Sequence, residues 1–356
     1  MCRKLRAPNR GCAAADPFFV AAGIRGGEGK RRKGEGAMQE KKRFSENSTV
    51  GEVIRDPVFS PFGRLLFPVD LSIPERMTLK QVSRSDVLLW YTNLHAEKTV
   101  EILNELYKRA SSGETIFYPI YSEQEQCENP DWRQTGLFYL RGSPGERFAI
   151  VSAGGGFYYV GAMHDSFPHA LELSRRGCNA FVLIYRPKTA WQDLGRAICF
   201  VEDHAEQLEI SPAGYSLWGG SAGARMAAVL GNRQHLEQLT GRSAISWKEG
   251  GSRAASESRT VLPQASAVIM QYTGFEDCSP DDAPTYACVG TEDRIAWWRG
   301  MEARLAQLES MGIPTEFHAY KGLQHGFGIG TGTVAEGWID DAVAFWDARS
   351  ESSAMH

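Results

Sequence analysis

The stretch "YSLWGGSAGARMAAVL" (residues 215–230) joins a short apolar run to a helix-forming run through small residues. Its centre, Gly219 to Gly223, fits the pattern G-x-S-x-G. A sharp strand-to-helix turn has room only for small neighbours, and it raises the serine hydroxyl above the sheet. The context therefore predicts that Ser221 is a nucleophile at the start of a helix. The plainer alternative is a tight turn in which Ser221 only caps the helix.

A serine hydroxyl is a weak nucleophile, so this hypothesis requires a base and an orienting acid further along the chain. Two later segments, "GTEDRI" and "QHGFG", each follow a β-rich run and contain Asp293 and His325. The interval between them accommodates one helix and one strand, which places both at the same sheet edge as Ser221. We therefore expect His325 to be the base and Asp293 the acid. The alternatives for the acid are Glu292, Asp281, Asp282, Glu276 and Asp277.

Three consecutive glycines, Gly154 to Gly156, stand in "SAGGGFYY" directly after the apolar run "RFAIV". They lack the G-x-G-x-x-G spacing of a dinucleotide site and the Gly-Lys-Ser/Thr of a phosphate loop. If Ser221 is a nucleophile, the backbone N–H groups of Gly155, Gly156 and Ala222 are suited to bind the oxyanion of a tetrahedral intermediate. The glycines thus predict an oxyanion hole.

Strand and helix patterns alternate over most of the chain, which predicts an α/β fold with a mostly parallel central sheet and helices on both faces. The stretch 240–260 is rich in Ser, Gly and Arg, and we expect it to be an excursion or a mobile loop. The expected strands are 115–121, 136–142, 147–153, 179–186, 215–219, 266–273, 285–291 and 314–321. The expected helices are 166–177, 189–208, 221–232, 295–311 and 335–348.

Three parts are expected along the chain. Residues 1–43 form a basic leader with twelve Lys/Arg and four Asp/Glu, expected to be disordered, and residues 1–37 are open to being an over-called translation start. Residues 44–114 have helix-period apolar positions and predict an N-terminal helical extension. Residues 115–350 form the catalytic domain.

At "AGGGF", "GGSAG", "GTEDRI" and "QHGFG" the chain resembles the α/β-hydrolase superfamily, in particular its acetylesterase and feruloyl-esterase-like branch. The resemblance covers about residues 115–348. It implies a serine esterase that acts on a small-molecule ester, needs no cofactor, and uses Ser221, His325 and Asp293 in the roles given above. Many relatives have His before the glycine triplet and Asp before the nucleophile, where this chain has Ala153 and Gly220.

The substrate pocket is less defined by the sequence than the chemistry. Bulky aromatic residues follow the glycines and occur in the N-terminal "LLWY", and they would suit a short acyl group. Phe157, Tyr158 and Trp90 are the candidate substrate-binding residues, and Trp297 and Trp298 are further candidates for the pocket roof. Two other functions stay open: a serine peptidase of the prolyl-oligopeptidase type, and a non-catalytic binding module on the same scaffold.

Composition narrows the remaining choices. Outside residues 1–43 the chain carries 27 Lys/Arg against 39 Asp/Glu, which argues against nucleic acid as a partner. No apolar run is long enough to cross a membrane, and the seven cysteines form no CxxC pair, so we expect a cytoplasmic protein with reduced thiols. In "HDSFPH", His164, Asp165 and His169 could suggest a metal site. Pro168 favours a helix start capped by Asp165 or Ser166, and we expect no metal.

Overall fold

The computed structural model describes residues 42–84, 86–249 and 261–352, so residues 1–41 of the expected leader and residues 250–260 of the stretch 240–260 lie outside these ranges. Its centre is an eight-stranded sheet in the order β1-β2-β4-β3-β5-β8-β9-β10. β2 pairs antiparallel with both β1 and β4, and the other neighbours are parallel. The mostly parallel sheet is confirmed. The strands are Phe117–Tyr118 (β1), Gly136–Leu140 (β2), Arg147–Ser152 (β3), Asn179–Ile184 (β4), Ser211–Gly220 (β5), Ala267–Gln271 (β8), Thr285–Gly290 (β9) and Thr315–Tyr320 (β10).

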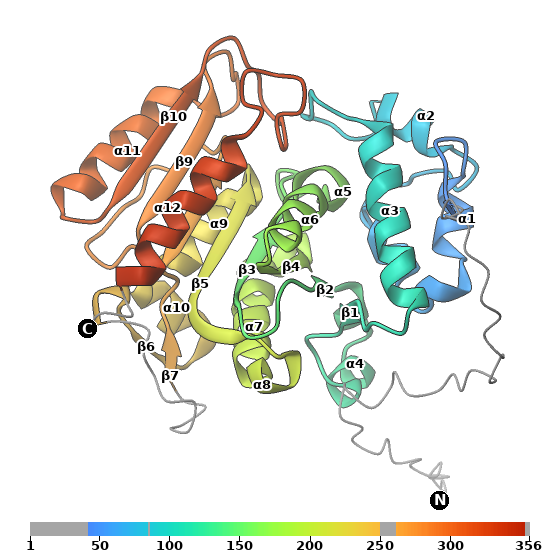
Figure 1. The fold of residues 1–356 in the computed structure, drawn as a ribbon, viewed down its shortest axis with the longest axis horizontal. Coiled ribbons are helices and arrows are strands. Elements are labelled where there is room, and N and C mark those ends of the chain that lie inside the picture. Colours follow the sequence, from blue (N-terminus) through green and yellow to red (C-terminus); the bar gives the residue numbers. More distant parts are fainter. Residues whose placement is uncertain (1–41, 85, 250–260, 353–356) are drawn as a thin grey trace, which may run out of the picture.

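Helices cover both faces of the sheet. The central parallel strands are therefore buried on both sides, which agrees with their continuous apolar sequences. α6 and α12 lie on the near face in Figure 1, and α9 lies behind the sheet. The α-helices after residue 115 are Glu123–Glu128 (α4), Ala162–Asp165 (α5), Phe167–Arg175 (α6), Ala190–Asp203 (α7), Ala205–Leu208 (α8), Ala222–Gly231 (α9), Arg233–Thr240 (α10), Trp298–Ser310 (α11) and Trp338–Ser352 (α12).

The strand order reverses at β3. The chain runs from β3 outward to β4 and then returns to β5 on the other side of β3. The loops that leave the carboxyl ends of the neighbouring strands β3 and β5 therefore lead to opposite faces of the sheet. Open α/β sheets bind their ligands in the crevice between two such loops. The glycine triplet follows β3 and Ser221 follows β5, so the topology brings these two motifs together.

The N-terminal region packs beside the β1–β2 edge of the sheet (Figure 1). It contains Val50–Ile54 (α1), Leu79–Arg84 (α2) and Ala96–Ser111 (α3). Its apolar residues belong to the same hydrophobic core as those of the sheet. The stretch 86–95 between α2 and α3 is not helical, because its backbone and side chains bond to loops of the sheet edge instead. The expected helical extension is thus interrupted at this point.

Several expected elements differ in length from those observed. The first strand is only two residues long, since Pro119 has no N–H for a ladder and the chain turns toward α4. The helix expected at 189–208 is broken at His204 into α7 and α8. The described part of the stretch 240–260 has regular structure. Its residues Ser243–Ile245 (β6) pair in parallel with Val261–Pro263 (β7), which directly follow the stretch, and Trp247–Glu249 form a short 3-10 helix.

Within the described ranges, no helix combines the length and the apolar character that crossing a bilayer requires. None of the five cysteines found there, Cys127, Cys178, Cys199, Cys278 and Cys288, forms a disulfide.

Candidate active site

Ser221 stands at the turn between β5 and α9 in a strained backbone conformation. Its φ of 51° and ψ of -116° lie where residues with a side chain rarely occur. The neighbouring glycines are required sterically, because a Cβ on Gly219 would lie 2.2 Å from the backbone of Gly223, and one on Gly223 would lie 2.0 Å from the carbonyl oxygen of Ser152. The Ser221 side chain makes no capping hydrogen bond to α9. Ser221 thus occupies the N-cap position of α9, but its side chain does not cap the helix.

A line of hydrogen bonds links Ser221 to His325 and Asp293. The Nε2 of His325 lies 3.0 Å from the Oγ of Ser221, and its Nδ1 lies 2.7 Å from Oδ2 of Asp293. When Nδ1–H donates to the carboxylate, Nε2 is left to accept the serine proton. Asp293 and His325 are buried, which shields the pair from water. The structure thus brings together the three residues that the sequence singled out, at the carboxyl ends of β5, β9 and β10.

The alternatives for the acid are placed elsewhere. Glu292 is exposed beside Asp293, and Glu276 and Asp277 are exposed after β8. Asp282 forms a buried ion pair with Arg304, and Asp281 binds Arg233. Among the acids considered, Asp293 is the one that contacts His325.

The glycine loop, residues 153–159, lies against Ser221. A Cβ on Gly154 would come within 2.9 Å of the Ser221 Cβ. Gly155 and Gly156 have φ values of 125° and 60°, which a residue with a side chain adopts only under strain. In the described part of the chain, the N–H groups of Gly155, Gly156 and Ala222 make no hydrogen bond. Three free donors beside Ser221 can receive an oxyanion, and their role stays a prediction.

The three candidate substrate-binding residues occupy different positions. Trp90 stacks on Tyr159 at 6.0 Å between ring centroids, and its ring would lie 2.9 Å from a Cβ on Gly156. Tyr158 packs at 6.0 Å from Trp90 and is 75% exposed. Phe157 turns away from these two rings and packs on Trp191, at 4.9 Å. The rings of Trp90 and Tyr158 therefore both lie beside Gly156, whereas the ring of Phe157 belongs to a separate aromatic contact.

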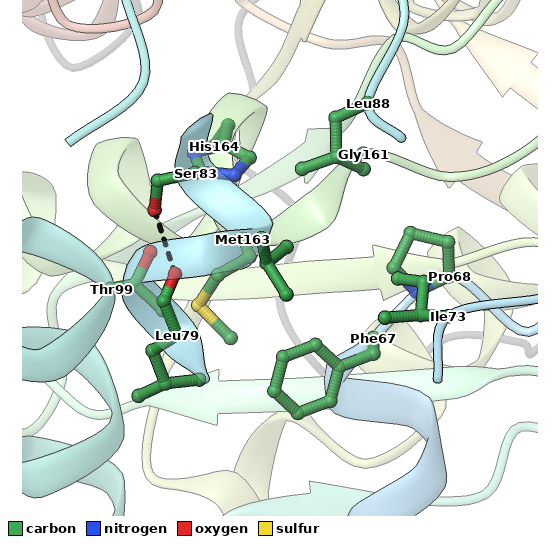
Figure 2. Close-up of a pocket in the computed structure, with 11 residues that line it drawn as sticks. Phe67, Pro68, Ile73, Leu79, Ser83, Leu88, Thr99, Gly161, Met163 and His164 are labelled. Carbon is green, nitrogen blue, oxygen red and sulfur yellow. Dashed lines mark hydrogen bonds between the residues drawn. The ribbon is translucent and has the colours of Figure 1, made fainter. Parts of the chain in front are cut away.

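In the segment "HDSFPH", His164 and His169 have separate surroundings. The described residues contain no group of three His, Cys, Asp or Glu side chains that could hold an ion. Figure 2 shows His164 beside Ser83 on the wall of a mainly apolar pocket, and burial lowers the pKa of His164 to about 4. The Nε2 of His169 lies 2.7 Å from the side-chain oxygen of Gln271. The expectation of a helix start with Pro168 in its first turn is confirmed, with Ser166 at the N-cap position.

Asp165 is a residue whose place the sequence did not reveal. Of the two caps that the sequence offered, Asp165 and Ser166, the structure places Ser166 at the N-cap, and the carboxylate of Asp165 is fully buried beside the backbone of Gly154 and Gly220. It accepts hydrogen bonds from the backbone N–H of Gly154 at 2.7 Å, from the hydroxyl of Tyr91 at 3.2 Å, and from the hydroxyl of Tyr272. The sequence signal that could have indicated this buried carboxylate is Gly220, since a Cβ at that position would lie 2.4 Å from the Asp165 oxygens.

Comparison with known proteins gives results that agree with this geometry. The BD-FAE family model matches residues 185–269, a range that includes β5 and Ser221. No curated protein matches the sequence. The solved structures that resemble the chain include an acetyl ester-xyloside bifunctional hydrolase from Caldicellulosiruptor lactoaceticus, with 18% identity and a TM-score of 0.53, where the match covers 65% of this chain and 95% of that one.

Two further solved structures are similar at lower TM-scores. A thermophilic esterase from the Planctomycetes species Thermogutta terrifontis has 18% identity and a TM-score of 0.46, over 59% of this chain and 85% of that one. The enzyme MGS-M1 from a Medee basin deep-sea metagenome library has 19% identity and a TM-score of 0.46, over 61% of this chain and 93% of that one. The strand order, the serine turn after β5 and the likeness to the Caldicellulosiruptor structure together show that this chain has the α/β-hydrolase fold.

Proposed function

We propose that this chain is a serine hydrolase that cleaves short-chain carboxylic esters through an acyl-enzyme on Ser221. The observation that carries the proposal is the line of hydrogen bonds from Asp293 through His325 to Ser221. It supplies a nucleophile, a base within reach of its proton, and a carboxylate that orients the base.

In the first half of the reaction the Oγ of Ser221 attacks the ester carbonyl carbon, and its proton moves to Nε2 of His325. The carbonyl oxygen becomes an oxyanion that accepts hydrogen bonds from the free N–H groups beside Ser221. His325 then gives the proton to the leaving alkoxide, which departs as the alcohol and leaves the acyl group on Ser221. Asp293 stays ionised and stabilises the imidazolium while it exists.

In the second half a water molecule attacks the acyl carbon while His325 takes its proton. The tetrahedral intermediate collapses to the carboxylic acid, and His325 returns the proton to the Oγ of Ser221. Each oxyanion donor contributes about 3 kcal/mol to such a transition state in other hydrolases, so the donors of the glycine loop would account for a large part of the rate.

The preference for a short acyl group rests on the rings beside the glycine loop. Trp90 lies over Gly156 and stacks on Tyr159, which takes up space next to the expected oxyanion. A long acyl chain would have to displace these rings. The acetyl ester in the name of the Caldicellulosiruptor hydrolase agrees with this preference.

The test compares the wild type with Ser221→Ala on p-nitrophenyl acetate, with fluorophosphonate labelling of the same proteins. We expect turnover and labelling in the wild type only. The matched control is Ser122→Ala, because Ser122 truly caps a helix, α4, and its loss should leave both signals unchanged. Retained turnover in Ser221→Ala would exclude the mechanism. Absence of labelling in the wild type would favour a binding module, and faster cleavage of peptide p-nitroanilides than of esters would favour a peptidase.

A further inference from the structure

We propose that Asp165 is a positioning residue that holds both the glycine loop and the histidine loop, residues 322–331, in the geometry that ester hydrolysis requires. The inference rests on the proposed function and adds to it a residue that does not touch the substrate.

Each of the three groups that hydrogen-bond to the Asp165 carboxylate is a donor. Oδ2 accepts from the N–H of Gly154 at 2.7 Å and from the hydroxyl of Tyr91 at 3.2 Å, and Oδ1 accepts from the hydroxyl of Tyr272. Three donors from separate parts of the chain meet on one fully buried side chain. A neutral amide could not replace it without turning an N–H group toward another donor.

The contact with Gly154 fixes the glycine loop at its first glycine. Gly154 directly precedes the two glycines whose N–H groups stay free. The direction of these N–H groups depends on the peptide before them, so the anchor at Gly154 sets where they point.

The contact with Tyr272 extends to the base. The hydroxyl of Tyr272 accepts a hydrogen bond from the N–H of Gly328 at 3.2 Å and donates to Asp165. The ring of Tyr272 lies 4.9 Å from that of His325, centroid to centroid. The histidine loop is thus tied to the same carboxylate through one tyrosine.

The contact with Tyr91 adds the N-terminal region. The next residue, Thr92, donates its hydroxyl to the carbonyl of His325 at 2.7 Å, and its N–H donates to the carbonyl of Gly326 at 3.3 Å. The stretch 86–95 therefore connects Asp165 and the histidine loop from outside the sheet.

Glycines on the adjoining backbone make room for the carboxylate. A Cβ on Gly220 would lie 2.4 Å from both Asp165 oxygens, and one on Gly154 would lie 2.8 Å from Oδ2. The carboxylate thus fills the space between the strand that ends in Ser221 and the glycine loop. Glutamate, with a longer side chain, would not fit the same space.

Asp165 is charged when the enzyme is assayed at pH 8. Burial raises the pKa of its carboxyl to about 6, against the hydrogen bonds from Tyr272 and Gly154, which lower it. The titratable groups that face it are Tyr91, Tyr159, Tyr185, Tyr272 and His325.

The experiment measures kcat and KM for p-nitrophenyl acetate at pH 8 in Asp165→Asn and Tyr272→Phe, together with amide hydrogen exchange of the glycine and histidine loops. We expect kcat to fall about 100-fold in Asp165→Asn, comparable to the loss of one oxyanion donor, and about tenfold in Tyr272→Phe. KM should change less than about threefold, since the substrate is not contacted. Exchange should rise in both loops and not in the sheet.

Two control variants change buried polar groups that do not contact the glycine loop or the histidine loop. Asp282→Asn breaks a buried carboxylate contact with Arg304, and Tyr139→Phe removes a hydroxyl bonded to Asn179. Both should lower stability and keep kcat. A kcat for Asp165→Asn near that of the wild type would overturn the inference and leave the proposed function intact. If the wild type itself lacks turnover, the proposed function fails, and unchanged loop exchange in Asp165→Asn would then refute the positioning role separately.

Discussion

The carboxylate of Asp293 is held on both oxygens: Oδ2 lies 2.7 Å from Nδ1 of His325, and Oδ1 accepts the backbone N–H groups of Ile295 and Ala296, each at 2.8 Å. The turn after β9 therefore fixes the direction of the acid before any substrate binds. In the proposed reaction, Nδ1–H of His325 donates to this carboxylate, and Nε2 is left to accept the Ser221 proton.

Replacement of Asp293 by asparagine keeps the size of the side chain and favours the wrong histidine tautomer. We expect kcat for p-nitrophenyl acetate to fall about 10⁴-fold in Asp293→Asn, as in other serine hydrolases with this change. The neighbouring exposed carboxylate provides the control, and Glu292→Gln should retain wild-type kcat. A large loss in Glu292→Gln with little loss in Asp293→Asn would reverse the assignment of the acid.

The glycine loop can be tested with one added methyl group. In Gly156→Ala the new Cβ would lie 2.9 Å from the Trp90 ring at a φ of 60°, so the loop must move. We expect kcat to fall 100-fold or more, on the order of one lost oxyanion donor. Gly145→Ala serves as the control, because Gly145 has a φ of 77° and open space around it. It should show the backbone strain as lower stability and keep its kcat.

The buried charge of Asp165 predicts a pH-dependent difference in stability. Its pKa is raised by burial from 3.8 to about 6, so between these values the folded protein keeps a proton that the unfolded chain has lost. This contribution to stability is present below pH 4 and is lost as the pH rises through 6, a loss of about 3 kcal/mol in total.

Asp165→Asn has no such loss. Its free energy of unfolding, relative to the wild type, should rise by about 2 kcal/mol from pH 4 to pH 7. Urea unfolding followed by tryptophan fluorescence at several pH values measures this difference, with Ser122→Ala as a variant whose difference from the wild type stays constant. Parallel curves for Asp165→Asn and the wild type would show that Asp165 does not titrate in this range.

The ring of Trp90 predicts a change in acyl preference. Trp90→Ala removes the ring from Gly156, and we expect the kcat/KM for p-nitrophenyl hexanoate relative to acetate to rise about tenfold or more, as space for added methylenes opens. Trp297 is 63% exposed and follows Asp293 in the sequence, so Trp297→Ala is the control for loss of a surface indole. An unchanged ratio in Trp90→Ala would mean that the acyl group lies elsewhere.

Much of the fold followed from local patterns. The strands of the central sheet after residue 135 were predicted within a few residues of the strand ends, except that β5 begins earlier, at Ser211, whereas the short pair β6 and β7 was not predicted. Buried parallel strands are short apolar runs between glycine-rich turns, and this signal is strong. The N-terminal region was harder to predict, because residues 86–95 bond to distant loops. Their local sequence resembles the helices on either side and contains no sign of those partners.

The candidate site shows the same division. The small residues around Ser221 and the triplet at Gly154 are required by backbone geometry, so the sequence by itself determined where the serine turn and the free N–H groups lie. The order of Ser221, Asp293 and His325 along parallel strands determined that they share one edge of the sheet. Only the tertiary structure decided that Asp165 turns inward to bind Gly154, Tyr91 and Tyr272. The physical reason is that a buried carboxylate is stable only where donors converge on it, and here they converge from stretches far apart in the sequence.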